Sequence, residues 1–201
     1  MIGPERDSSD EALAARAAAR DDTAFEMLVT RYQSRVFRLA CRLTSETDAP
    51  DVLQETFLQV YRHLGAFRGD SRFSTWIYRI ATNAALMHRR AHGRRPAESL
   101  ETFLPRFDAD GKHLATPEAL LMASRVDELL DRKQLAEQAR AAIEHLPNLY
   151  REAFVLRDLE ELPTADVAEV LGVEPATVRQ RVHRARLMLR GYLSELAGVA
   201  P

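Results

Sequence analysis

Residues 172–190, GVEPATVRQRVHRARLMLR, have the pattern of the turn and second helix of a helix-turn-helix. Gly172 suits the left-handed backbone that such a turn needs, and Pro175 fixes where the following helix begins. In the preceding PTADVAEVL, Ala168 is small enough to let the two helices cross closely. At 100° per residue, the second helix has one apolar stripe, made of Val178, Val182, Ala185 and Leu189. The stretch therefore predicts a helical domain near the C-terminus.

The same helix carries a strong positive charge. No acid occurs between residues 175 and 194, although the whole chain has a net charge of -2. A second stripe, flanked by Gln180 and Arg184, consists of Arg179, His183, Arg186 and Arg190. A helix that is buried on one side and arginine-rich on the other fits the major groove of DNA, where Arg and Gln read base edges. The alternative is a solvated basic helix on a protein that never contacts DNA.

Composition limits the class of protein. The chain has 201 residues, of which 46% are hydrophobic and 29% charged, as expected for one medium or two small globular domains. No apolar run approaches the roughly 20 residues of a membrane span, and the N-terminus has no apolar signal core. Cys41 is the single cysteine, which excludes an internal disulfide and favours a small buried side chain. We expect a cytoplasmic protein without membrane insertion.

Helical periodicity runs through most of the chain, and no stretch alternates with period two. The first expected helix begins near Thr23, with a capping box of Thr23 and Glu26 and a buried stripe through Leu28 and Tyr32. Helices after Pro50 and from Phe73 follow. The pattern fails between residues 96 and about 118, where Pro and acids accumulate. The predicted fold is therefore all-α, with two small helical domains, 1–95 and 135–201, joined by a linker, 96–134, that is acidic and extended in its first part.

The helix after Pro50 has two different faces. Its expected buried stripe contains Leu53, Phe57, Val60 and Leu64, while Asp51, Glu55 and Leu58 lie on the opposite face with Gln54 beside them. An outward leucine beside two carboxylates predicts a docking surface for a basic protein partner.

The helix from Phe73 divides in the same way. Five residues are expected to face inward, namely Phe73, Ile77, Ile80, Ala84 and Met87, with Trp76 in the core at their edge. The outward set has Asn83 at its margin and comprises Thr75, Arg79, Thr82, Leu86, Arg89 and Arg90. Together with the preceding loop RGDSRFS, this polar and basic face is suited to unstacked bases.

Three stretches together resemble bacterial RNA polymerase sigma factors of the extracytoplasmic-function class. They are DAPDVLQETFLQVYRHLGAFRGDSRFSTWIYRIATNAA, LPNLYREAFVLRDLEELPTADVAEVLGV and PATVRQRVHRARLMLR, and they cover most of both domains in the family's order. The resemblance implies a sigma-2-like helical bundle and a sigma-4-like helix-turn-helix domain. It also implies recognition of minus-35 and minus-10 promoter elements, help in promoter melting, and a linker that threads toward the polymerase active site.

The resemblance assigns roles to residues. Docking on the clamp helices of the largest polymerase subunit is implied for Asp51, Gln54, Glu55 and Leu58. Contacts with the minus-10 element are implied for Asp70, Ser71, Arg72, Phe73, Ser74, Arg79, Asn83 and Arg90. Contacts with the minus-35 element are implied for Thr177, Arg179, Gln180, Arg181, His183, Arg184 and Arg186. The implied partners are core RNA polymerase, including its flap region, promoter DNA and an anti-sigma factor.

We assign no catalytic residue, cofactor or metal from the sequence. His88 and His92 have a metal-like spacing without a third ligand, and DADG at 108–111 resembles a calcium loop in which Lys112 occupies a ligand position. Glu174 stands where the family often has a better helix cap. The competing hypotheses are a stand-alone helix-turn-helix regulator, which leaves 51–95 without a purpose, and an adaptor that binds only protein, which leaves the arginine stripe unexplained.

Overall fold

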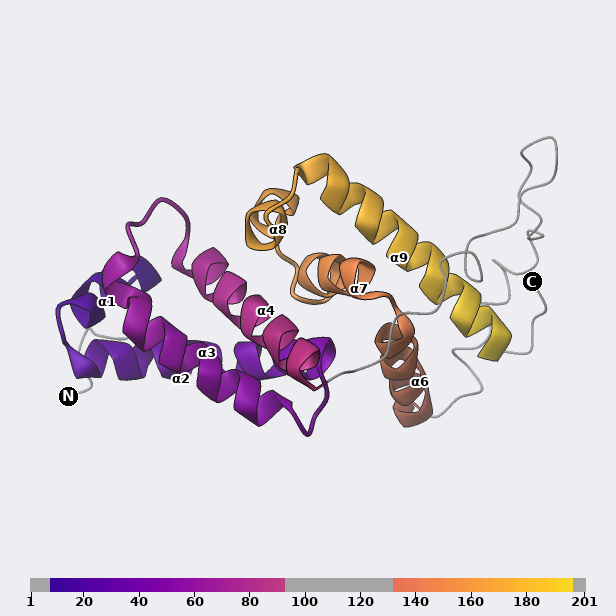
Figure 1. Cartoon of the computed structure of the whole chain (residues 1–201), viewed down its shortest axis with the longest axis horizontal. Helices are drawn as coiled ribbons and strands as arrows, with labels where there is room; N and C mark the ends of the chain where they lie inside the picture. The colour runs from indigo at the N-terminus through magenta and orange to yellow at the C-terminus, as the bar shows by residue number, and fades with distance from the viewer. Residues whose placement is uncertain (1–7, 93–131, 197–201) are drawn as a thin grey trace.

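The computed structural model describes residues 8–92 and 132–196, and the regular elements in both ranges are helices, which confirms the all-α class. The N-terminal half contains α1 (Asp10–Ala18), α2 (Asp22–Leu43), α3 (Ala49–His63), a 3-10 turn (Leu64–Ala66) and α4 (Phe73–Ala91). The C-terminal half contains α6 (Arg132–His145), α7 (Asn148–Phe154), a π-helical turn (Val155–Leu159), α8 (Thr164–Leu171) and α9 (Pro175–Leu196). Figure 1 shows the two halves side by side, with α4 and α8 where they meet.

The start of the bundle differs from the expected one in two ways. Helix α1 was not predicted; it begins after Ser9, whose hydroxyl accepts the Ala12 N–H at 3.1 Å. The predicted capping box at Thr23 is wrong, because Asp21 caps α2 by accepting the Ala24 N–H at 3.1 Å. Arg16 of α1 holds the same carboxylate in an ion pair of 2.8 Å. The α1–α2 junction is therefore fixed by one aspartate that serves both helices.

The core of the N-terminal half follows the predicted stripe on α2. Five buried α2 side chains line it: Leu28, Tyr32, Val36, Leu39 and Leu43. The predicted buried stripe of α3 is confirmed at Val60 and Leu64, whereas Leu53 and Phe57 are only partly covered and Val52 and Thr56 are buried beside them. The Thr56 hydroxyl donates to the Val52 carbonyl at 2.7 Å, so its polar atom is satisfied within the helix. Trp76 is buried in the core, as predicted.

The helix-turn-helix forms as predicted. Gly172 ends α8 in the left-handed conformation, with φ 63°, and the Val173 N–H donates to the Ala168 carbonyl at 3.0 Å. Val178 and Ala185 of α9 are fully buried, and Val182 is buried with them. These contacts fix which face of α9 remains available to solvent.

A buried arginine joins α6 to α7. The Arg151 guanidinium donates to the carbonyls of Ile143 at 2.9 Å, Leu146 at 3.0 Å and Glu144. Ile143 and Glu144 lie in the last turn of α6 and Leu146 follows it, where carbonyls lack the full set of helical partners; the Ile143 carbonyl also accepts the Leu146 N–H at 3.2 Å. Burial lowers the pKa of Arg151 to about 10, so the side chain stays charged at neutral pH. Arg151 therefore caps α6 from the next helix.

The two halves pack against each other through α4 and α8. Thr75 Oγ1 lies 3.3 Å from an Asp166 carboxylate oxygen, and the Tyr78 hydroxyl donates to Glu160 at 3.2 Å. Glu160 also forms an ion pair with Arg42 of α2. Burial, followed by the Glu160 carboxylate, raises the pKa of Tyr78 to about 12. We call this arrangement the closed interface; it comprises Arg42, Thr75, Tyr78, Glu160 and Asp166.

Several predictions fall outside the described residues. Most of the linker 96–134 lies there, with DADG and the helical pattern expected from 117 to 131. The boundaries of the two domains and the course of the linker therefore stay predictions. Among residues 8–92 and 132–196, no helix is long and apolar enough to cross a membrane.

Candidate protein and nucleic-acid interfaces

The acidic face of α3 lies open to solvent. Pro50 sits in the first turn of α3, and Asp51, Gln54 and Glu55 are exposed. The Leu58 side chain beside them is 42% exposed. Gln59, one turn after Glu55, donates to its carboxylate at 2.7 Å and so holds that acid in place. The structure thus brings the four predicted docking residues together on one surface, which we call the α3 face.

A hollow next to this helix was not foreseen from the sequence. It has a volume of ≈ 340 Å³ and lies between α2 and α3, lined by Gln33, Ser34, Phe37, Arg38 and Leu53. Phe37 is partly exposed at its edge, and Leu53 is one of the two α3 residues that were expected to be buried and are only partly covered. The sequence feature that could have indicated this hollow is Phe37, an aromatic residue outside the predicted buried stripe of α2.

The loop before α4, residues 69–72, is the predicted minus-10 loop. Asp70 and Arg72 are exposed, Ser71 and Ser74 are half-buried, and Gly69 turns the chain with φ 77°. The loop borders an open cavity of ≈ 420 Å³. Three further acids from other elements line that cavity: Glu11 of α1 and Asp166 and Glu169 of α8. Acids of the C-terminal half therefore lie across from a loop predicted to bind nucleic acid.

The predicted contact of Phe73 with the minus-10 element requires a correction. Its ring is fully buried, with ring centroids 5.5 Å from Tyr32, 5.6 Å from Phe67 and 5.7 Å from Trp76. A ring enclosed by three aromatic neighbours presents no face on which a base could stack. Phe73 therefore serves the core and does not contact the minus-10 element in this conformation.

The outer face of α4 is partly covered. Arg79 is half-buried, and Asn83 and Arg90 are exposed, so these three remain accessible. Thr75 and Thr82, which were expected to face solvent, are buried, and Thr75 bonds to α8. Met87 is 69% exposed although it was expected to face inward. The periodicity of α4 alone could not reveal that α8 covers part of its polar side.

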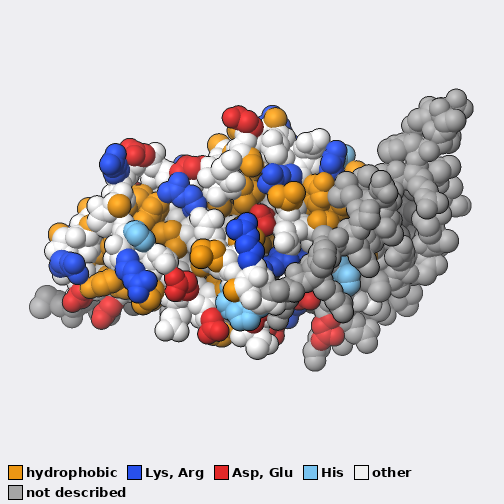
Figure 2. All heavy atoms as spheres, viewed as in Figure 1, with side chains coloured by type: hydrophobic (Ala, Val, Ile, Leu, Met, Phe, Trp, Pro, Cys, Tyr) orange, Lys and Arg blue, Asp and Glu red, His pale blue; other side chains and the backbone are white. Residues whose placement is uncertain are grey.

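The recognition helix α9 presents a basic surface. Arg179, Gln180, His183 and Arg186 are exposed, whereas Thr177, Arg181 and Arg184 are half-buried. On the face of the molecule drawn in Figure 2, basic and acidic side chains are interspersed over both halves. Basic side chains therefore do not form a single patch on that face.

Two of these arginines already have partners in the protein. Arg186 forms a bidentate ion pair with Asp158, at 2.7 Å from Nε to Oδ2 and 2.8 Å from the terminal nitrogen to Oδ1. This hydrogen bonding raises the pKa of the Arg186 guanidinium. Arg184 donates to the Tyr150 hydroxyl at 3.3 Å. The role of Asp158 was missed, because no local pattern links it to a helix that begins 17 residues later.

A buried carboxylate lies behind the basic surface. Glu152 of α7 is buried, and burial raises its pKa, while the charges of Arg89, Arg181 and Arg90 oppose that rise. These arginines belong to α4 and α9, so Glu152 offsets positive charge at the point where three helices converge. Within the described residues, no group of three or more His, Cys, Asp and Glu is arranged to hold a metal. The His88 and His92 rings stack with centroids 4.1 Å apart.

Both halves match known families by sequence. The Sigma-70 region 2 family matches residues 28–95, and the Sigma-70 region 4 family matches residues 136–189. The ECF RNA polymerase sigma-E factor of Haemophilus influenzae is 38% identical over 193 residues, which covers 94% of this chain and 97% of that protein. The sigma-E factor of Escherichia coli is 38% identical over 182 residues, covering 89% and 91%.

The fold is similar to solved structures. CnrH, determined in complex with the cytosolic domain of CnrY, is 26% identical, with a TM-score of 0.65 over 96% of this chain and 100% of that one. The sigma factor RpoE of Bartonella quintana, in complex with the anti-sigma factor NepR, shares the fold at 23% identity, with a TM-score of 0.60 over 88% and 98%. The chain therefore belongs to the extracytoplasmic-function (ECF) RNA polymerase sigma factors, which direct promoter-specific transcription, and is not a stand-alone helix-turn-helix regulator.

Proposed function

We propose that this sigma factor docks on the clamp helices of the largest polymerase subunit through the α3 face. The observation that carries the proposal is the exposure of Asp51, Gln54 and Glu55 around an uncovered Leu58. Carboxylates around an apolar contact suit a basic partner surface, because charge steers the encounter while the leucine supplies buried area. The hollow beside Leu53 offers room for an additional side chain of the same partner.

The two DNA elements are assigned to separate surfaces. The minus-10 element is received by Asp70, Ser71 and Arg72 of the loop and by Ser74, Arg79, Asn83 and Arg90 of α4. The minus-35 element is read by the exposed side of α9, where Arg179, Gln180 and His183 lie in the first two turns. Arg and Gln there can make bidentate bonds to base edges, while arginines further along meet phosphates.

The chemistry of RNA synthesis belongs to the polymerase, and we assign no catalytic residue to this chain. Since the bacterial polymerase works on the chromosome, we expect the protein in the cytoplasm. CnrH was solved with the cytosolic domain of a second protein, CnrY. We expect an anti-sigma factor to restrain this chain in a comparable way, and the purified chain to be active with core polymerase without a small ligand or phosphorylation.

The first experiment reverses charge on the α3 face. The double variant Asp51→Lys with Glu55→Lys should reduce affinity for core polymerase by at least about tenfold, because like charges then face each other across the interface. Helicity should stay unchanged, since both side chains are exposed. The measurement is co-elution with core enzyme and run-off transcription from a genomic library.

Glu26→Lys on the exposed side of α2 is the control, because it makes the same change at one site away from the α3 face. Unchanged co-elution of the double variant would refute the docking assignment. A wild-type chain that yields no promoter-specific transcripts with core enzyme would refute the assignment of the two DNA surfaces.

A further inference from the structure

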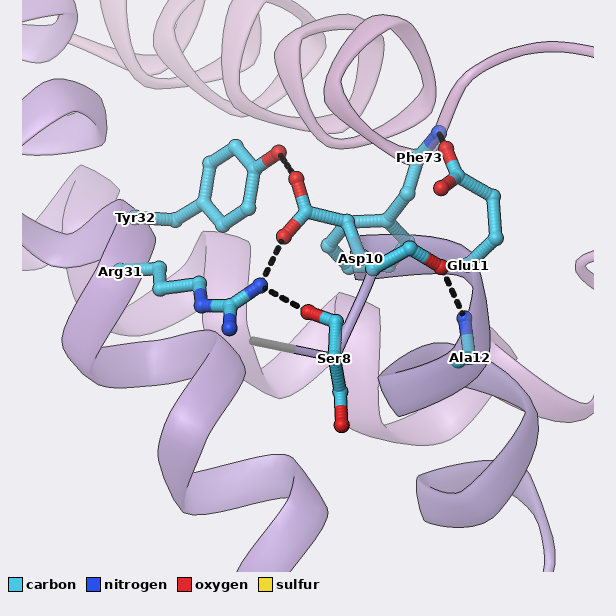
Figure 3. Close-up of polar contacts among 8 residues, drawn as sticks. Ser8, Asp10, Glu11, Ala12, Arg31, Tyr32 and Phe73 are labelled. Carbon is cyan, nitrogen blue, oxygen red and sulfur yellow. Dashed lines mark hydrogen bonds and ion pairs between the residues drawn. The ribbon is translucent and has the colours of Figure 1, made fainter. Parts of the chain in front are cut away.

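Helix α1 precedes the residues matched by the region 2 family, which begin at 28, yet it is bonded to both α2 and α4. Figure 3 shows these contacts. Asp10 accepts from Arg31 of α2 at 2.8 Å and also from the Tyr32 hydroxyl. Arg31 donates in addition to the Ser8 carbonyl at 2.8 Å. These bonds fasten the start of α1 to the middle of the bundle.

The next residue, Glu11, reaches a different helix. Its carboxylate accepts the backbone N–H of Phe73 at 3.3 Å (Figure 3). Phe73 is the first residue of α4, and Arg72 at the N-cap position makes no side-chain cap bond. The first N–H groups of a helix lack internal partners, and a negative charge there is favourable to the helix dipole. Glu11 thus does for α4 what an N-cap residue ordinarily does.

Asp10 and Glu11 both support Phe73, each through a different contact. Glu11 binds its backbone, while Asp10 binds the hydroxyl of Tyr32, whose ring packs edge-on against the Phe73 ring. Burial, followed by the Asp10 hydrogen bond, raises the pKa of Tyr32, so the phenol remains a donor. Phe67, at the other end of the minus-10 loop, packs on the same Phe73 ring. Phe73 therefore anchors both ends of the loop.

We propose that α1 positions the minus-10 loop, with Glu11 as the positioning residue that fixes the start of α4 through the Phe73 N–H. The inference rests on the proposed function, in which Asp70, Ser71, Arg72 and Ser74 receive bases of the minus-10 element. A loop held at both ends loses less conformational entropy when it captures a base, so a preorganised loop opens the promoter faster. Glu11 itself need not contact DNA for this role.

The test compares two variants of Glu11 in reconstituted holoenzyme. Glu11→Gln keeps an acceptor oxygen for the Phe73 N–H, whereas Glu11→Ala removes it. With Glu11→Ala we expect promoter opening, followed by permanganate reactivity on a promoter found by run-off transcription, to slow by about three- to tenfold, the range for loss of a helix cap. Glu11→Gln should retain most of the wild-type rate. Affinity for core enzyme should be the same for all three proteins.

Hydrogen exchange at the Phe73 amide provides the direct readout. It should accelerate in Glu11→Ala and remain slow in Glu11→Gln, while exchange in the core of α2 stays unchanged. Glu26→Ala, an exposed acid on α2, is the matched control and should open promoters at the wild-type rate.

Equal opening rates for Glu11→Ala and wild type would overturn the inference, as would an equal defect in the alanine and glutamine variants. Either result would leave the proposed function intact, provided that wild-type holoenzyme opens the promoter. A wild-type holoenzyme that does not melt the promoter would instead refute the proposed function itself.

Discussion

Individual arginines of α9 differ in what surrounds them, so their loss should have different consequences. Arg179 is exposed in the first turns of the helix, within reach of base edges in our proposed orientation. Replacing it with alanine should cost about 1–3 kcal/mol of promoter binding and blur preference within the minus-35 element. Arg190 lies three turns further on; Arg190→Ala should weaken binding evenly and flatten the salt dependence by about one unit.

Binding of holoenzyme to a panel of minus-35 base substitutions, repeated at several salt concentrations, measures both effects. How the loss of affinity is distributed over the base substitutions and salt concentrations is more informative than the size of the loss. Altered sequence preference in Arg190→Ala, together with unchanged preference in Arg179→Ala, would show that the helix lies in the groove in the opposite orientation.

At the residue scale, the sequence predicted which side chains are exposed better than it predicted which ones are covered by segments far away in the sequence. Asp51, Arg179 and their neighbours are exposed because helical periodicity places them opposite a buried stripe. Periodicity also placed Phe73 in the core, and its ring is fully buried. It could not predict the burial of Thr75, whose partner Asp166 lies 91 positions away in another helix. Nor could it predict that Tyr32 and Phe67, from other parts of the chain, pack on the Phe73 ring.

At the level of elements, the turn between α8 and α9 depends on one glycine. A methyl group added at Gly172 would meet no atom within 4 Å, so the penalty comes from the backbone alone. With φ at 63°, Gly172→Ala should lower the free energy of unfolding by about 1–2 kcal/mol. Urea unfolding followed by circular dichroism measures this change.

Gly191 is the matched control, because it lies inside α9 and a methyl group there would also meet nothing within 4 Å. Its backbone is helical, so Gly191→Ala should raise the free energy of unfolding by about 0.5–1 kcal/mol. The same substitution should therefore have opposite signs at two positions. If both variants were destabilised equally, the left-handed turn would not be the cause.

The elements that the sequence did not predict are the ones with weak local signals. Helix α1 has nine residues and buries only Leu13 and Ala14 fully, which is too short a stripe for periodicity to detect. The start of α2 was assigned to Thr23 because Thr23 and Glu26 have capping-box spacing, but Asp21 takes that position through its additional bond to Arg16. The helix-turn-helix was predicted correctly because Gly172, Pro175 and the apolar stripe of α9 all indicate the same turn and the same following helix.

For the molecule as a whole, the closed interface covers part of the polar side of α4, so we expect it to open when the proposed minus-10 surface binds promoter DNA. Glu160 is central, since its side chain is only 4% exposed and meets both Arg42 and Tyr78. Glu160→Ala removes the carboxylate that bonds both to Arg42, which is 32% exposed, and to the Tyr78 hydroxyl, so it weakens the contact between the halves. We expect this variant to be more expanded than wild type by small-angle X-ray scattering.

Arg140→Ala is the control for this experiment. Arg140 also pairs across the halves, with Glu46, but the two side chains are 63% and 67% exposed. Exposed ion pairs contribute little, so this variant should scatter like wild type. If Arg140→Ala alone were expanded, the two halves would be held together by the α2–α6 contact and not by the α4–α8 contact. The sequence predicted two helical halves but could not predict their contact, because periodicity shows which side of a helix is apolar and not which other helix covers it. Buried apolar residues of both halves form one continuous cluster.

The ion pair between Arg186 and Asp158 has a consequence for the order of events on DNA. A phosphate that takes the Nε edge of Arg186 must displace a carboxylate that already holds it with two bonds. Exposed residues earlier in α9 face no such exchange and can engage at the first encounter. With α9 placed in the groove as proposed, we therefore expect recognition in two stages: the exposed residues of the early turns engage first, and Arg186 exchanges Asp158 for a phosphate afterwards.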